Sequence, residues 1–201
     1  MTENTPETLD RISLNAIRDT IMSISDHPKV NKRKIALLGS SRGAELVLNL
    51  ASRYKDFDAV VALVPSYVNF PSLTTAVNTS AWTFHGDELN YVGIPYTAIA
   101  AAIRGESHKA IEIALENLDD RSSSIIPVEN ISGPILLLSA KDDALWPSKY
   151  MSDKIVSRLI EKDFKYYYEH FSFNGGHHDT KKHFDKVFKF LDNHFKQSEL
   201  E

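Results

Sequence analysis

The sequence predicts an α/β fold in which a mostly parallel sheet carries helices on both faces. Short apolar runs without polar alternation, typical of strands buried on both faces, alternate with longer segments of helical periodicity. The size of the chain also fits, because 201 residues with 42% hydrophobic composition suffice for one continuous core. We therefore expect residues 1–201 to form a single domain.

The expected elements alternate along the chain. Apolar residues at helical spacing predict a first helix over residues 8–24. Strands are expected at residues 35–38, 59–64, 134–138 and 165–171, and further helices at 43–53, 149–160 and 183–195. Residues 66–125 hold aromatic residues among Gly and Pro, with a helical stretch at 111–118. We expect this segment to leave the sheet as a lid-like excursion.

Composition excludes several classes of protein. A formal net charge of −4 gives no reason to expect a nucleic-acid partner. The chain has no cysteine, which rules out disulfides, thiolate metal sites and thiol nucleophiles. The N-terminus is polar and acidic, unlike a secretion signal, and the apolar runs are too short to cross a bilayer. We expect a soluble, cytoplasmic protein without a membrane partner.

A motif for a catalytic serine follows the first expected strand. Ligands of open parallel sheets bind at the carboxyl ends of the strands, so the residues after each apolar run are the first candidates. Gly39-Ser40-Ser41-Arg42-Gly43 fits G-x-S-x-G between a strand and a helix. Ser41, the central residue, is the expected nucleophile. The backbone amide of Arg42 is the expected oxyanion donor.

The next strand ends carry the other members of a catalytic triad. Asp142 and Asp143 follow the strand at 134–138, and His177 follows Gly175-Gly176 after the fourth strand. The order Ser, Asp, His is the one used by α/β-hydrolases. Asp142 lies nearer the strand end and is preferred, while Asp143 stays open as the alternative. We expect neither a metal nor another cofactor, because no helical His-x-x-x-His spacing or glutamate base accompanies the histidines.

Several segments point to a specific family. They are Ser25-Asp26-His27-Pro28-Lys29-Val30, Leu37-Leu38-Gly39-Ser40-Ser41-Arg42-Gly43-Ala44-Glu45-Leu46, Ser80-Ala81-Trp82-Thr83-Phe84-His85-Gly86 and Ile126-Pro127-Val128-Glu129. Together they resemble the C-terminal catalytic domain of acyl-CoA thioesterases and bile acid-CoA:amino acid N-acyltransferases, which have the α/β-hydrolase fold. The resemblance extends over roughly residues 10–195.

The resemblance implies a serine hydrolase that cleaves acyl thioesters of CoA or related esters. Ser41 would attack the acyl carbonyl, with His177 as general base and Asp142 as its partner, through an acyl-enzyme. The acyltransferase branch uses cysteine at the nucleophile position, so serine favours hydrolysis. Residues 80–95 are expected to lie over the site, with Trp82, Phe84 and Tyr91 binding the acyl chain. The alternative is that these aromatics pack the excursion onto the body.

The turn at Gly39-Ser40-Ser41-Arg42-Gly43 is the nucleophile elbow of this fold, and the sequence begins at the helix before the strand that leads into it. We therefore expect the preceding strands of a complete fold to be missing, together with the loop that supplies a second oxyanion amide. This expectation leaves a second hypothesis open, a truncated, non-catalytic relative that acts as a binding or partner subunit. It also makes the strand at 34–38 a sheet edge. We expect the N-terminal helix or a second copy of the chain to cover it, with a homodimer as the simplest solution.

Overall fold

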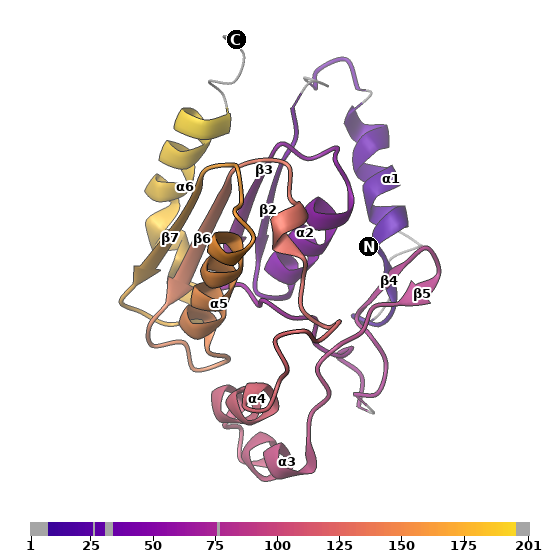
Figure 1. Ribbon diagram of the computed structural model, residues 1–201, viewed down its shortest axis with the longest axis vertical. Coiled ribbons are helices and arrows are strands. Elements are labelled where there is room, and N and C mark those ends of the chain that lie inside the picture. Colours follow the sequence, from indigo (N-terminus) through magenta and orange to yellow (C-terminus); the bar gives the residue numbers. More distant parts are fainter. Residues whose placement is uncertain (1–7, 26, 31–33, 76, 196–201) are drawn as a thin grey trace.

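A four-stranded sheet forms the centre of the molecule (Figure 1). The computed structural model describes residues 8–25, 27–30, 34–75 and 77–195. The strands are β2 (Ala36–Ser40), β3 (Ala59–Leu63), β6 (Ile135–Ala140) and β7 (Tyr168–Phe173). They lie in the order β2-β3-β6-β7, and each neighbouring pair is parallel. The predicted parallel sheet is thus confirmed.

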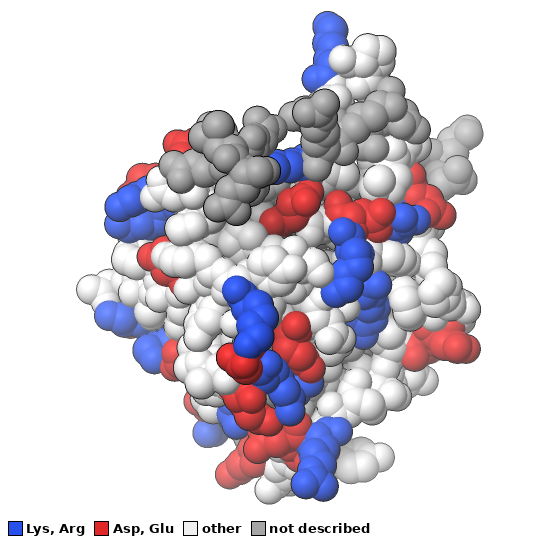
Figure 2. Space-filling view, turned by 45° about the horizontal axis from the view of Figure 1, so that its top comes forward, with Lys and Arg blue, Asp and Glu red and all other residues white. Residues whose placement is uncertain are grey.

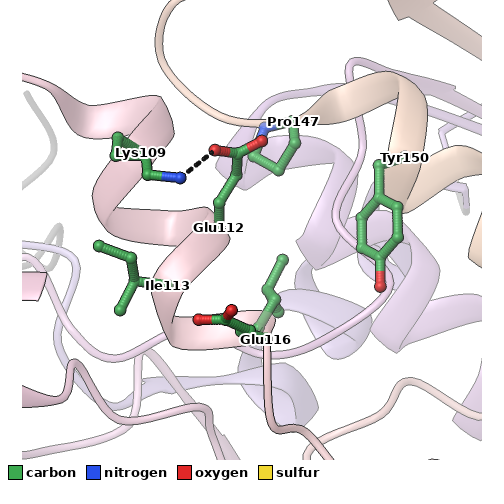
Figure 3. A pocket seen from close by; sticks show the side chains of 7 residues that line it. Lys109, Glu112, Ile113, Glu116, Pro147 and Tyr150 are labelled. Carbon is green, nitrogen blue, oxygen red and sulfur yellow. Dashed lines mark hydrogen bonds and ion pairs between the residues drawn. The ribbon is translucent and has the colours of Figure 1, made fainter. Parts of the chain in front are cut away.

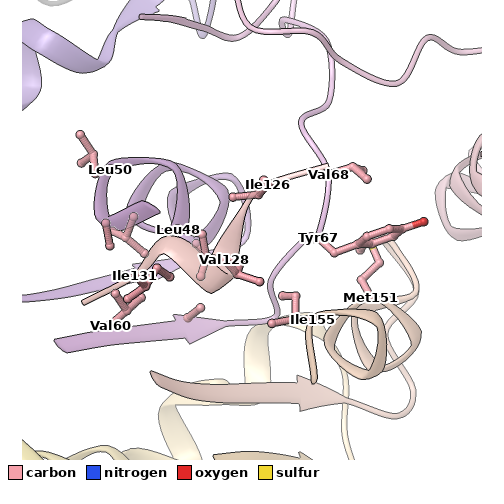
Figure 4. Packing of buried hydrophobic residues seen from close by; sticks show 14 of the residues in the cluster. Leu48, Leu50, Val60, Tyr67, Val68, Ile126, Val128, Ile131, Met151 and Ile155 are labelled. Carbon is pink, nitrogen blue, oxygen red and sulfur yellow. The ribbon is translucent and has the colours of Figure 1, made fainter. Parts of the chain in front are cut away.

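Helices cover both faces of this sheet, as the apolar runs predicted. All five residues of β3 are buried. Val60 and Ala62 pack into one core with α2 (Arg42–Arg53) and α5 (Ser148–Glu161), and Figure 4 shows how Leu48 lies close to Val60 there. Val61 and Leu63 face a second core against α6 (Phe184–Phe190). The absence of alternation in the strand therefore reflects two apolar environments.

A second, smaller sheet lies beside the main one. It consists of β1 (Ile12–Ser13), β4 (Trp82–Phe84) and β5 (Asp87–Glu88), in the order β1-β4-β5. Helix α1 (Leu14–Ser25) follows β1 and packs against α2 and β4. The expected helix at 8–24 therefore begins six residues later, because the chain first pairs with β4.

The excursion between β3 and β6 contains two helices. They are α3 (Tyr96–Ile103) and α4 (Ser107–Leu115), which pack on each other and lie together at the lower end of Figure 1. The sequence predicted a helix at 111–118, and α4 begins earlier and ends earlier. Helix α3 was not expected. The segment returns to β6 through a short 3-10 turn, η1 (Val128–Asn130).

The C-terminal elements differ in detail from the expected ones. Strand β7 lies two to three residues later than the apolar run at 165–171. A 3-10 segment, η2 (His177–His183), then leads into α6, and a π-helical turn, η3 (Leu191–Phe195), follows it. The chain is thus helical from Phe184 to Phe195, which confirms the expected helix at 183–195, although its second half is π-helical.

Strand β2 is one of the two edge strands of the main sheet, with β7 at the other edge. Leu37 is buried, whereas Leu38 on the opposite face is 46% exposed. The expectation that both faces of this strand are buried was therefore wrong for Leu38, which lies on a strand that has a described neighbour, β3, on one side alone. Pairing of this edge with a second copy stays a prediction.

The surface carries charges of both signs. On the face drawn in Figure 2, basic and acidic side chains lie beside one another, so this face offers no continuous basic strip to a phosphate backbone. None of the helices in the described ranges combines the length and apolar character that a bilayer crossing requires.

The two glycines of the elbow motif have different structural roles, which gives a first prediction. A Cβ at Gly39 would lie 2.1 Å from the Gly43 carbonyl oxygen, whereas a Cβ at Gly43 meets nothing within 4 Å. We expect Gly39→Ala to lower the free energy of unfolding by about 3 kcal/mol or more. Gly43→Ala is the matched control and should change it by less than about 1 kcal/mol. Urea unfolding of both variants measures this, and equal effects would contradict it.

Candidate active site

Ser41 occupies a sharp turn between β2 and α2. Its backbone has φ 58° and ψ −123°, a conformation that side-chain-bearing residues rarely adopt. The Ser41 amide donates to the Leu63 carbonyl oxygen at 2.9 Å, which holds the turn against β3. Strained single residues of this kind are typical of nucleophile elbows.

His177 and Asp143 form a buried pair after the two neighbouring strands. Nδ1 of His177 lies 2.9 Å from both carboxylate oxygens of Asp143, and the two side chains are 6% and 1% exposed. The carboxylate fixes Nδ1 as the protonated ring nitrogen, so Nε2 is left to accept a proton.

The carboxylate beside His177 is Asp143, which corrects the preference for Asp142. The Asp142 side chain is exposed and accepts a hydrogen bond from the Gly175 amide at 3.1 Å. A second bond runs from the Asp142 amide to the Gly175 carbonyl. Asp142 therefore ties the end of β6 to the histidine loop, and the chain turns Asp143 inward.

Hydrogen bonds keep Asp143 ionised in spite of its burial. Burial alone would raise the pKa of this carboxyl group, but the bond from His177 and other donors outweigh it and lower the pKa below its usual range. The donors include the backbone amides of Leu145 and Trp146. An ionised Asp143 is the form that can stabilise a cationic imidazole.

Ser41 and His177 line one cavity of about 480 Å³. In the described part of the chain, the Ser41 hydroxyl and the His177 ring make no hydrogen bond with each other. In enzymes without substrate this contact is often long and tightens in the complex. The cavity thus brings together the expected nucleophile and the expected base.

Two aromatic residues support the histidine from the cavity side. Trp146 packs edge-on against His177, with ring centroids 5.7 Å apart, and its Nε1–H donates to the Val64 carbonyl. Phe70 stacks on the other side of Trp146 at 5.8 Å. Sequence reasoning missed both residues, although Trp146 lies three residues after Asp143 and Phe70 six residues after the expected strand at 59–64.

A buried glutamate one turn after Ser41 holds the cavity wall. Glu45 is fully buried and accepts hydrogen bonds from Trp82 Nε1 at 2.6 Å and from the Phe70 amide at 3.2 Å. Its other oxygen pairs with Arg42. The Arg42 guanidinium also donates to the carbonyl oxygens of Phe70 and Pro71. Burial raises the pKa of Glu45 to about 7, against the opposing effect of Arg42.

The three aromatic residues expected to bind substrate lie elsewhere. Trp82 is 2% exposed, bonded to Glu45 and absent from the cavity lining, so it is part of the packing. Phe84 packs edge-on against Tyr54. Tyr91 lines a different pocket, on the outer side of α4. The assignment of these residues to the acyl chain is therefore corrected, and the alternative of packing holds for Trp82 and Phe84.

Another pocket, on the far side of α4, has a different character. Figure 3 shows Glu112 of α4 directed toward Lys109, with which it is paired at 3.3 Å, while Glu116, just after α4, and Tyr150 of α5 also line the hollow. This hollow of about 310 Å³ contains no serine and no histidine. Among the described residues no group of acidic or histidine side chains is arranged to hold a metal ion. The chemistry thus points to the Ser41 cavity.

Comparison with known proteins identifies the family of the chain. The family model for the C-terminal region of BAAT and acyl-CoA thioester hydrolases matches residues 12–181. The chain belongs to this family. Human acyl-coenzyme A thioesterase 1 is 28% identical over 159 residues, which cover 78% of this chain and 35% of that protein. Mouse acyl-coenzyme A amino acid N-acyltransferase 1 is 27% identical, over 77% of this chain and 34% of that protein.

The chain spans about a third of the length of the curated relatives it matches. Among solved structures, the acylaminoacyl peptidase of Pyrococcus horikoshii superposes with a TM-score of 0.60. The match has 16% sequence identity and covers 94% of this chain and 28% of the peptidase. At this identity the likeness shows the α/β-hydrolase fold alone, and the family membership rests on the sequence.

The raised pKa of Glu45 predicts a pH-dependent contribution to stability. The unfolded carboxyl group loses its proton near pH 4.5, before the folded one at about 7, so this group stabilises the fold below pH 4.5 and the gain is lost as pH rises to 7. We expect the stability difference between wild type and Glu45→Gln to fall by about 3 kcal/mol across this range. Chemical unfolding at several pH values measures it. Glu112→Gln, at an exposed position of α4, is the control, and a constant difference for Glu45→Gln would contradict the prediction.

Proposed function

We propose that this chain is a serine hydrolase that cleaves acyl thioesters of CoA, or related esters, through an acyl-enzyme on Ser41. The observation that carries the proposal is the buried His177–Asp143 pair, which lines the same cavity as the serine of a strained elbow. Membership of the acyl-CoA thioester hydrolase family supports the substrate class. Serine at position 41 supports hydrolysis rather than transfer to an amine.

The arrangement accounts for each step of acyl transfer. His177 Nε2 takes the proton of Ser41 Oγ as the oxygen attacks the acyl carbonyl, and Asp143 stabilises the imidazolium that forms. The C–S bond of the tetrahedral intermediate then breaks, and His177 protonates the leaving thiolate. Water, activated by the same imidazole, attacks the acyl-serine and releases the carboxylic acid and free Ser41.

The Arg42 amide is the proposed oxyanion donor. Arg42 is the first residue of α2, so its amide has no acceptor within the helix, and the helix N-terminus favours a developing negative charge. A second donor is not assigned in the described residues. Since one donor contributes about a hundredfold to a thousandfold in rate, a single amide predicts a modest kcat.

The second candidate is a non-catalytic relative that binds a partner through the open edge of β2. The half-exposed Leu38 on that edge is the observation in its favour. A fluorophosphonate probe separates the two functions, because it labels only an activated serine. Labelling of the wild-type chain supports the hydrolase, and its absence supports the binding subunit.

We predict that Ser41→Ala loses both labelling and hydrolysis of acyl-CoA. The expected loss of kcat is roughly 10⁶-fold, to the limit of detection, because the variant lacks the oxygen that attacks the acyl carbonyl. The melting temperature should stay nearly unchanged, since the side chain contributes to chemistry and not to the core. Activity that survives in a folded Ser41→Ala variant would refute the nucleophile.

The two neighbouring aspartates should differ sharply. Asp143→Asn removes the charge that holds His177 and is expected to lower kcat by roughly 10³- to 10⁴-fold. Asp142→Asn is the matched control and should change kcat by less than about fivefold, because its side chain only accepts a bond from a backbone amide. Steady-state kinetics of both variants measure this difference. A larger loss of kcat in Asp142→Asn than in Asp143→Asn would identify Asp142 as the partner of His177.

A further inference from the structure

The cavity beside Ser41 is mainly apolar. Ten of its fifteen lining residues are Ala, Val, Ile, Leu, Pro, Phe or Trp. Its volume of about 480 Å³ lies in the range of small-molecule sites. At the mouth, Leu73 and Val77 are 65% and 40% exposed, so apolar surface remains uncovered next to the serine. An apolar ligand would bury this surface.

The cavity has no free charge to offer a ligand. Arg42 is its one charged lining residue apart from the His177 ring. Both terminal nitrogens of Arg42 are already bound, by Glu45 and by the carbonyl oxygens of Phe70 and Pro71, and its Nε is buried. A carboxylate at the far end of an acyl chain would therefore lose its hydration without gaining a partner. The site favours a chain with an uncharged end.

The helices α3 and α4 form the wall that faces away from the sheet. Helix α3 contains no charged residue, and its Ala102 lines the cavity, as do Ala110 and Ile111 of α4. The opposite face of α4 carries Lys109 and Glu112 and lines the polar pocket of Figure 3. One face of α4 is thus apolar toward Ser41, and the other is charged.

Helix α4 reaches the main core through Ile111 and Leu115, whereas the contact between α3 and α4 forms a cluster of its own. Ala98, Ala101 and Ala110 pack against one another in a cluster of their own, with Ile94 and Ile113 beside them. The His108 ring donates a hydrogen bond to the Asp143 carbonyl oxygen, which fixes α4 relative to the His177 partner. A change of side-chain size at the exposed Ala102 would therefore alter the cavity and leave both main cores in place.

From these observations we infer that the α3–α4 wall is the acyl-chain site and that Ala102 sets the length of chain that it accepts. The preferred substrate is a medium-length, unbranched acyl group without a charged end. This inference rests on the proposed hydrolase function and adds the substrate's chain and the residue that selects it.

The test compares Ala102→Phe with wild type on acetyl-CoA and octanoyl-CoA. In the wild type, kcat/KM should rise by about fourfold for each added methylene until the cavity is full. Ala102→Phe should lower kcat/KM for octanoyl-CoA by about tenfold or more and change that for acetyl-CoA by less than about twofold. Ala100→Phe is the control, because Ala100 is exposed on the same helix and does not line the cavity.

Charge selectivity is tested with hexanoyl-CoA and adipoyl-CoA, which have six-carbon chains and differ in the terminal carboxylate. The wild type should hydrolyse hexanoyl-CoA at least about tenfold more efficiently. Equal efficiency, or equal effects of Ala102→Phe on short and long chains, would overturn the inference while leaving the hydrolase intact.

A binding measurement tests the acyl-chain site independently of catalysis. Calorimetry with Ser41→Ala should show octanoyl-CoA binding that Ala102→Phe weakens in the same background and Ala100→Phe does not. If the wild type is not labelled and hydrolyses nothing, the proposed function fails, and this binding difference alone decides the acyl-chain site. No difference between the two phenylalanine variants would refute it.

Discussion

The buried carboxylate of Glu45 is the contact on which the elbow region depends. It joins three segments that are distant in sequence: helix α2, the loop at Phe70 and strand β4 through Trp82. A carboxylate so fully removed from water is unfavourable unless every oxygen has a partner, and burial still raises its pKa to about 7. Loss of any one of its three partners therefore removes a hydrogen bond from a buried carboxylate, so the elbow helix, the loop and the small sheet are held together through Glu45.

The contacts of Glu45 also fix the positions of the side chains in the candidate site. Arg42, held by Glu45, binds the backbone of the loop that carries Phe70, and Phe70 in turn stacks on Trp146. Trp146 rests against His177, whose other side is bound by Asp143. The position of the proposed base thus depends on packing that begins at the helix of the proposed nucleophile. Because the Arg42 guanidinium is used in this support, the cavity beside it stays uncharged.

The parallel sheet, the elbow and the histidine loop could be predicted because each leaves a local mark: an unbroken apolar run, a glycine pattern or a strand end. The choice between Asp142 and Asp143 depends on how the chain turns after β6, and the role of Trp82 depends on Glu45, 37 residues away. Neither the choice of aspartate nor the role of Trp82 can be inferred from the residues next to it in the sequence. Helix α3 escaped prediction for a related reason. Its uncharged residues show no amphipathic period, since part of its apolar surface stays exposed.

The unequal surroundings of Gly39 and Gly43 bear on how relatives of this chain are recognised. Close approach of the backbone demands glycine only at the first position, where any side chain would meet the Gly43 carbonyl. The second position opens toward free space, so evolution can place a small residue there without disturbing the turn. In a pattern for this elbow, the first glycine is therefore a steric requirement of the turn, whereas the second is not.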